Sequence, residues 1–278
     1  MNDILALPTG ALAHSSLATA RSSVSRPIVD HSIRSFLFAR LLADHDGSLN
    51  DADYDEDLLF AATVMHDLGL GEHATGEARF EIEGADLAAA VLRRHGVAER
   101  DVDRVWEAIA LHASLGIAHR RGLLTSLTHK GVFVDAGRIT DGVADRLRQE
   151  VLDAYPRSAG DRSIADAIVA HATRSDAAAP PGSLAFELLR QHRDADRARV
   201  QRQESARTAP SIHVRAALTW LAIFPLVAIG ITAMAPFTVG WDPVLRAFVL
   251  ILVVVSLAVY LVVPWLMSTY DRYLAPRR

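Results

Sequence analysis

Two long apolar runs near the end of the chain limit most strongly what this protein can fold into. The first, Ala217–Phe237, contains no charged residue, and the second, Leu245–Met267, contains only Arg246 near its outer end. Each run is long enough to cross a bilayer as a helix, and a short turn-like segment, GWDP, lies between them. We therefore expect a transmembrane helical hairpin rather than two helices buried in a soluble core.

The residues that flank these runs are typical of membrane helices. Trp220 and Trp265 fall near the ends of the runs, where amphipathic rings prefer the interface. Arginines precede the first run and YDRYLAPRR follows the second, whereas the connecting loop has almost no cations. The positive-inside rule then predicts a multi-pass protein of the cell (inner) membrane, with the preceding domain and the C-terminus facing the cytoplasm. Membrane lipids are the expected partner of the hairpin, and Ala216-Ala217 and Gly230 could pack against a second copy, giving a homo-oligomer.

Charge is unevenly distributed along the chain, whose formal net charge is −4. Residues 188–215 hold seven arginines against three acids, and residues 216–278 hold four against two, so residues 1–187 carry about −10. A region this acidic is a poor general binder of nucleic acid, and we expect no nucleic-acid partner. The chain has no cysteine, so any metal site must consist of His and carboxylate ligands.

Residues 28–175 show helical periods and no strand-like alternation. DHSIRSFLFARLLADH has one apolar face with Asp30 as the expected N-cap, and DVDRVWEAIALHAS has another with Asp101 as the cap. DEDLLFAATVMHD is apolar on nearly all sides, which is typical of a central helix. We predict an all-α protein with three parts: a helical bundle domain at 1–180, a basic linker helix at 181–213 and a two-helix transmembrane anchor at 214–278.

Several polar side chains fall on helix faces that ought to be apolar. His66 and Asp67 end the central helix, His31 opens an earlier helix, and Asp135 lies in the apolar run GVFVDAG. Burying a lone carboxylate is costly unless it is paired or coordinates a metal. Two imidazoles and two carboxylates together would suit one divalent metal ion, namely Fe, Zn, Mn or Co.

The order of these residues resembles the HD superfamily of metal-dependent hydrolases and, more narrowly, its cyanamide hydratase-like branch. HSxR followed by HDLGL and RFExxGA is the specific combination, and the likeness spans roughly residues 5–175. The resemblance implies that the metal ligands are His31, His66, Asp67 and Asp135. The segments that carry it are ALPTGALAHSSLATA, HSIRSFLFARLLA, ATVMHDLGL, ARFEIEGADLAAAVLRRHG, VWEAIALHAS, HKGVFVDAG and YPR at 155–157.

The resemblance also implies a chemistry, in which a metal-activated water attacks an electrophile. In the cyanamide branch the electrophile is a nitrile carbon, and in most of the wider superfamily it is the phosphorus of a phosphate ester. We expect a hydrolase or hydratase that acts on a small nitrile-like or amide-like molecule. One alternative is a phosphohydrolase for nucleotides or phosphate esters, with Arg93-Arg94 or Arg120-Arg121 near the metal. The other is a non-catalytic, metal-bound scaffold at the membrane.

Three further residues are candidates for catalytic contacts. His112 lies on the inner stripe of its helix and could carry a proton or touch the substrate. Glu81 could orient the bound water or the substrate, and Arg34 could contact an anionic intermediate or brace a ligand. Each could instead be structural, as a core hydrogen bond, a helix-start carboxylate and an ion pair respectively. A second metal is left open because three histidines follow the His-Asp doublet: His112, His119 and His129.

Overall fold

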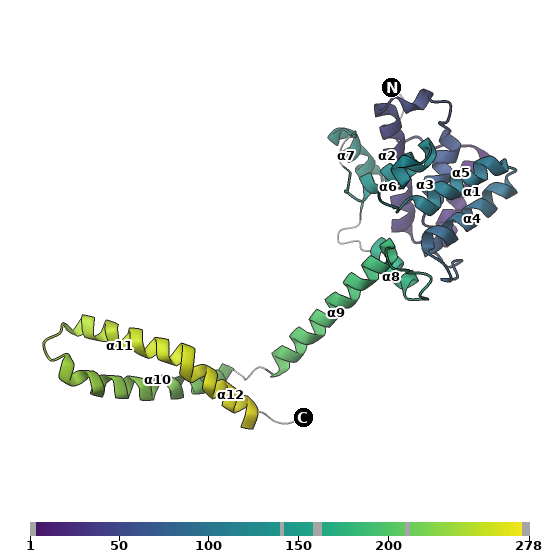
Figure 1. Cartoon of the computed structure of the whole chain (residues 1–278). Coiled ribbons are helices and arrows are strands. Elements are labelled where there is room, and N and C mark those ends of the chain that lie inside the picture. Colours follow the sequence, from purple (N-terminus) through teal and green to yellow (C-terminus); the bar gives the residue numbers. More distant parts are fainter. Residues whose placement is uncertain (1–3, 140–141, 158–162, 209–211, 274–278) are drawn as a thin grey trace. The chain divides into compact units, whose positions relative to one another are not determined.

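The computed structural model describes residues 4–139, 142–157, 163–208 and 212–273, and within these ranges it contains helices and loops but no strand (Figure 1). Two compact units, Met1–Arg197 and Ala198–Arg278, make up the chain, and each is described by itself. The predicted all-α fold, a helical bundle followed by an apolar helical hairpin, is confirmed.

The first unit is built from short and medium-length helices with three 3₁₀ turns between them. In chain order these are α1 (Ala11–Ser23), α2 (Arg26–His45), η1 (Ser48–Asn50), α3 (Glu56–Met65), η2 (Leu68–Leu70), α4 (Phe80–Arg94), α5 (Glu99–Leu111), η3 (Ala118–Arg120), α6 (Leu123–Asp135), α7 (Asp145–Ala154), α8 (Ser163–Ala172) and α9 (Leu184–Thr208), which continues past Arg197.

Helix α3 is the central helix of this unit, as its all-round apolar pattern predicts. It contacts α1, α2, α5 and α6, and every residue from Leu58 to Met65 is buried. The helix begins at Asp55, whose side chain accepts a hydrogen bond from the Leu58 amide at 3.0 Å. Phe60 of α3 meets Phe36 of α2 edge to face, with ring centroids 4.9 Å apart. The last residues of α3 therefore lie in the interior of the unit.

Helices α2 and α6 form the most extensively packed pair in the unit. Gly131 makes this close approach feasible, because a Cβ atom there would lie 2.2 Å from the carbonyl oxygen of Ser35. The pairing brings the first half of α2 beside the end of α6. As a result His31 and Asp135, which are far apart in the sequence, become neighbours.

Two of the expected helix caps are wrong. Helix α2 begins at Arg26, more than a turn before Asp30, because Pro27 is well suited to the first turn of a helix. Helix α5 begins at Glu99, so Asp101 lies inside the first turn instead of capping it. There the carboxylate still faces the positive end of the helix dipole.

A second, smaller apolar cluster joins α8 and the start of α9 to α4. It is centred on Phe80, which is fully buried against Ile168 and Ala172 of α8 and Ala185 and Leu189 of α9. The first turns of the expected linker helix therefore pack into the first unit.

The second unit holds the two apolar runs as helices: α10 (Ile212–Met234), the 3₁₀ turn η4 (Ala235–Phe237), α11 (Pro243–Leu257), the π-helical turn η5 (Ala258–Val262) and α12 (Val263–Tyr273). Two continuous stretches, Ile212–Phe237 and Pro243–Leu266, are long and apolar enough to cross a membrane. Only 6% and 11% of their most apolar windows are buried, which differs from the core helices of the first unit.

Small residues and proline have identifiable places in this hairpin. Gly230 of α10 faces α11, since a Cβ atom there would lie 2.6 Å from Cδ1 of Leu250. This glycine is therefore used within the hairpin, where small residues allow close helix packing. Pro225 lies inside α10 without ending it, as expected for apolar helices of this length.

Candidate metal centre

The His66–Asp67 pair lies at the point where α3 ends and the η2 turn begins. His66 is 0% exposed and Asp67 is 3% exposed, so both polar groups lie in the interior. Gly69 in the following turn lets α4 approach, because a Cβ atom there would lie 2.0 Å from the Phe80 carbonyl oxygen. A Cβ atom on Gly84 of α4 would lie 3.0 Å from the His66 carbonyl oxygen and 3.1 Å from the Gly69 amide nitrogen. The HDLGL sequence thus holds the doublet against α4.

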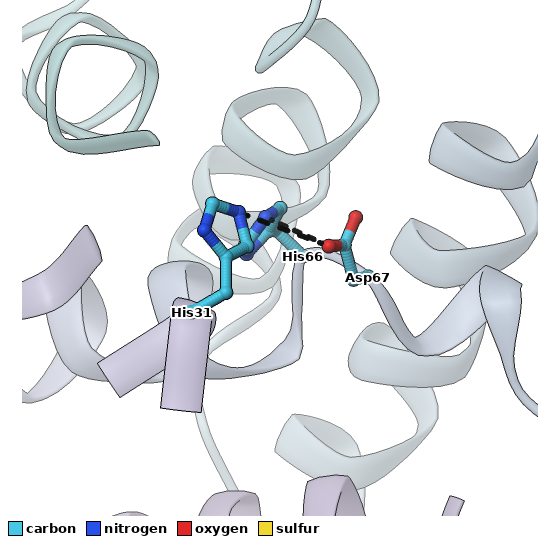
Figure 2. A group of neighbouring side chains, drawn as sticks. All are labelled: His31, His66 and Asp67. Carbon is cyan, nitrogen blue, oxygen red and sulfur yellow. Dashed lines mark ion pairs between the residues drawn. The ribbon is translucent and has the colours of Figure 1, made fainter. Parts of the chain in front are cut away.

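His31 of α2 joins this doublet to form a three-residue group that could hold a metal ion. One ligand atom from each of His31, His66 and Asp67 lies within 4.8 Å of the others. Figure 2 shows the two imidazoles facing the Asp67 carboxylate. His66 Nε2 and His31 Nε2 lie 3.3 Å and 4.0 Å from Asp67 Oδ2.

The hydrogen bonds of the two imidazoles leave the same nitrogen free in each ring. His66 Nδ1 lies 2.6 Å from the carbonyl oxygen of Thr63, and His31 Nδ1 lies 2.6 Å from Asp135 Oδ2. These oxygens accept, so the proton of the neutral ring belongs on Nδ1 and the lone pair on Nε2. Two such lone pairs aimed at one carboxylate are the donor set that a divalent ion needs.

Two buried atoms at this point lack a hydrogen-bond partner in the described part of the chain, His66 Nε2 and Asp67 Oδ2. An unsatisfied buried polar atom is destabilising, and a cation between them would satisfy both. Burial lowers the pKa of His66, but the adjacent Asp67 carboxylate outweighs it and raises that pKa. For Asp67 burial acts to raise the pKa, and His66, His31 and His112 bring it well below the ordinary value. The residues present therefore fit a divalent metal ion.

His112 lies beside this group at the end of α5. Its Nδ1 lies 2.7 Å from the Ile109 carbonyl oxygen, its Nε2 lies 3.9 Å from Asp67 Oδ1, and its ring centroid is 4.7 Å from that of His66. Burial and the neighbouring His66 lower the pKa of His112 to about 3, so it is neutral at neutral pH. A neutral ring with Nδ1–H on a carbonyl presents its Nε2 lone pair to the site.

Asp135, at the end of α6, lies on the far side of His31 from Asp67. Arg34 donates to both carboxylate oxygens, from Nε to Oδ1 at 2.8 Å and from Nη2 to Oδ2 at 2.9 Å. Burial would raise the pKa of Asp135, but His31 and Arg34 hold it well below the ordinary value. Asp135 is thus an ionised carboxylate that fixes the His31 ring.

Comparison with known proteins gives a family for this arrangement. The family model described as "HD domain" matches residues 28–207, more than half of the chain. The chain belongs to the HD-domain family. A second family model, described as "Y2318 C-terminal domain", matches residues 209–274. No curated protein matches the chain.

HD domains bind divalent metals and are generally metal-dependent hydrolases, which agrees with the group found here. In this HD-domain protein His31, His66 and Asp67 come together as the sequence predicts. Asp135 lies outside that group, and its assignment as a fourth ligand stays a prediction. His112 lies directly beside this group, whereas Arg34 is connected to it through Asp135, and the catalytic roles of both residues stay predictions.

Among the predicted site residues, Glu81 has the weakest connection to the metal group. It is buried in α4, and Arg79 Nη2 donates to its Oε1 at 2.7 Å. Its predicted part in orienting water or substrate stays a prediction. His129 donates from Nδ1 to the His112 carbonyl oxygen at 2.7 Å, and its ring lies 6.4 Å from that of His119. These two histidines therefore form a neighbouring pair beside the HD centre.

One contact of Asp135 was not predicted from the sequence. Arg157, in the segment after α7, donates from Nη2 to Asp135 Oδ1 at 2.9 Å and to the Asp135 carbonyl oxygen. In the same segment the Tyr155 carbonyl oxygen accepts from Arg34 Nη1 at 3.2 Å. The YPR tripeptide is one of the segments that carry the family resemblance, but no local sequence pattern predicts that it lies at the metal centre.

Proposed function

We propose that this protein is a membrane-anchored HD-domain hydrolase or hydratase that acts on a small nitrile-like or amide-like molecule. The observation that carries the proposal is the buried group of His31, His66 and Asp67, in which His66 Nε2 and Asp67 Oδ2 lack a hydrogen-bond partner within the described residues. In a structural core most buried polar atoms have hydrogen-bond partners, and two unsatisfied atoms on adjacent residues that face one another are the arrangement that a bound cation would satisfy.

The roles of the residues follow from their geometry. His31, His66 and Asp67 would hold one divalent ion through Nε2, Nε2 and a carboxylate oxygen. A divalent ion bound there lowers the pKa of a coordinated water toward neutrality. His112 is neutral and directs its Nε2 toward Asp67, so it can accept a hydrogen bond from a water or a substrate group held at the site.

Burial supports a small substrate. The three group residues and His112 are almost completely enclosed, and α4 closes over the η2 turn through Gly69 and Gly84. A site of this kind suits a molecule of a few heavy atoms better than a polymer. The nitrile or amide class is supported by the likeness of the motifs to the cyanamide hydratase-like branch, which is an argument by analogy.

A phosphohydrolase of the kind first considered would need cations near the metal. Two of the arginines named for that role are engaged elsewhere: Arg93 pairs with Glu99 at 2.9 Å and Arg121 with Glu107 at 2.7 Å, and both arginine side chains are about half exposed. These contacts favour the nitrile or amide class over an extended phosphate-binding surface.

The membrane part of the proposal is supported by the two apolar helical stretches, Ile212–Phe237 and Pro243–Leu266. Positive charge on both flanks would keep the HD domain and the C-terminus in the cytoplasm, with membrane lipids around the hairpin. The site would then act on molecules at the cytoplasmic face of the membrane.

Metal analysis and a substrate screen on the detergent-solubilised full chain test this proposal. Wild type should carry close to one divalent ion per chain, and His66→Ala and Asp67→Ala should lose it, whereas the exposed His95→Ala variant should keep it. The metal-loaded protein is then assayed on cyanamide, small nitriles, small amides and nucleotides. Phosphate release without nitrile or amide turnover would establish the phosphohydrolase instead. A bound metal without any turnover would leave the scaffold alternative.

A further inference from the structure

The loop between α5 and α6 (residues 112–122) exposes two large apolar side chains to solvent. Leu115 is 67% exposed and Ile117 is 53% exposed. Among the described residues of Met1–Arg197, the other exposed large apolar side chain is Leu49, at 38%. Apolar side chains scattered singly over a surface are ordinary, but two of them close together in one loop indicate a surface that meets a partner.

Backbone hydrogen bonds hold this loop in a defined turn. The Ser114 amide donates to the Leu111 carbonyl oxygen at 2.8 Å, and the Ser114 carbonyl oxygen accepts from the amides of Ile117 at 3.3 Å and Ala118 at 3.1 Å. Ala118 is fully buried, so the end of the turn is fixed to the unit. Leu115 and Ile117 are therefore presented to solvent by an ordered turn.

The charge around this loop differs from that of the unit that carries it. Residues 108–134 hold three cationic side chains and no Asp or Glu, although residues 1–187 carry about −10. Two of the three cations pair with acids outside this stretch. The third, Arg120, is exposed and contacts no carboxylate within the described residues, and its Nε donates to His119 Nε2 at 3.4 Å. A cation beside exposed apolar side chains suits a partner that is both anionic and apolar.

A lipid bilayer meets both requirements better than a protein surface does. Two side chains supply far less area than the roughly 800 Å² per partner that a stable protein interface buries. A bilayer contact needs no such area in this chain, because the apolar helices of the second unit would tether the loop to the lipid. A tether makes a weak second contact effective without a large interface.

We propose that the α5–α6 loop is a membrane-docking loop, in which Leu115 and Ile117 enter the bilayer interface and Arg120 binds anionic lipid headgroups. This inference rests on the membrane part of the proposed function and adds a second point of attachment. Leu115 follows His112 by three residues, which span at most about 11 Å. Since His112 Nε2 lies 3.9 Å from Asp67 Oδ1, docking would keep the metal centre close to the lipid surface.

The experiment places an environment-sensitive fluorophore on single cysteines of the full chain in lipid nanodiscs, because the chain has no cysteine of its own. Leu115→Cys and Ile117→Cys report on the loop, and Leu49→Cys, between Asp46 and Asp51, is the matched control. The discs contain a headgroup-level quencher in zwitterionic lipid, with or without phosphatidylglycerol. We expect strong quenching in the two loop variants with phosphatidylglycerol, less without it, and only background quenching in the control.

A second substitution tests the part given to the cation. Fluorescence lifetimes of labelled Leu115→Cys give the ratio of docked to free loop. Adding Arg120→Gln should lower this ratio about fivefold in the anionic discs, the factor expected for one cation near such a surface. Adding Arg100→Gln instead, where the side chain is 83% exposed, should leave the ratio unchanged.

Three results would overturn the inference. The first is quenching in the loop variants no greater than in Leu49→Cys, and the second is a ratio that Arg120→Gln does not change. The third is a blue-shifted emission without lipid quenching, because it would show that protein covers the loop. Failure of the membrane anchor itself is distinguishable, since the chain would then not co-purify with the discs.

Discussion

His31 and Asp135 are 104 positions apart in the sequence, and His31 Nδ1 lies 2.6 Å from Asp135 Oδ2. This contact fixes the imidazole so that its other nitrogen faces Asp67. Asp135, the last acidic residue of the predicted ligand set, therefore has a hydrogen-bond partner within the protein. Two buried helices, α2 and α6, are held at a distance that allows the pair to form.

Replacing Asp135 tests whether it acts through His31 or as a ligand. In Asp135→Asn the shape is retained but the charge that holds the Nδ1–H is lost. We expect divalent-ion affinity, measured by competition with a chelator, to fall about 10- to 100-fold, as for other residues that orient a metal-bound His. Asp67→Asn should lose more divalent-ion affinity, because it replaces one of the three residues of the metal group. Equal losses in the two variants would instead assign Asp135 as a ligand.

Gly69→Ala should disrupt the packing behind the His-Asp doublet. The new Cβ atom would lie 2.0 Å from the Phe80 carbonyl oxygen, so α4 must move away from the η2 turn. We expect a loss of about 1–3 kcal/mol in the free energy of unfolding, together with lower metal content. Thermal unfolding measures the first, and the control is Gly122→Ala, where a Cβ atom meets nothing within 4 Å. Equal stability of both variants would contradict the close approach.

Glu83 gives a pH dependence outside the metal centre. Burial raises its pKa, but the backbone amides of Ala78, Gly76 and Thr75 donate to the carboxylate and lower the pKa on balance. A lowered folded-state pKa stabilises the protein above the unfolded value of 4.5, and this stability is lost as the pH falls through the folded value.

Glu83→Gln should therefore be less stable than wild type by about 1–2 kcal/mol at pH 7, and the difference should shrink below pH 4.5. Denaturant unfolding at several pH values measures it. Glu72→Gln, at an exposed position, is the control and should match wild type throughout. A difference that grows on acidification would refute the assigned direction.

The absence of cysteine allows a clean test of the predicted membrane orientation. Gly240→Cys places a thiol in the exposed loop between α10 and α11, and Asn50→Cys places one in η1 of the HD domain. With both flanks in the cytoplasm, a membrane-impermeant maleimide should label Gly240→Cys in intact cells. It should label Asn50→Cys only after lysis. The reverse pattern would show the opposite orientation, and identical labelling of the two variants would argue against a spanning hairpin.

Local patterns were sufficient for the helical class, the apolar hairpin and the His-Asp doublet. Helical periodicity and uninterrupted hydropathy depend on neighbours a few positions away, so they can be read without knowing the rest of the fold. Helix starts were less predictable: α2 begins at Arg26 instead of behind Asp30, since proline and serine upstream form an equally good start. Several residues within a short stretch can each cap a helix, and tertiary packing decides which of them does.

By itself, the sequence determined that the chain is all-α, that it ends in two apolar helices, and that His31, His66 and Asp67 are candidate metal ligands. The tertiary structure decided which nitrogen of each imidazole faces the centre, where Asp135 lies, and that Arg34 and Arg157 share that carboxylate. Arg34 and Tyr155 are 121 positions apart, and only the packing of helices brings such residues within hydrogen-bonding distance. Hydrogen bonds act over about 3 Å, so their partners are set by the three-dimensional fold and not by spacing along the chain.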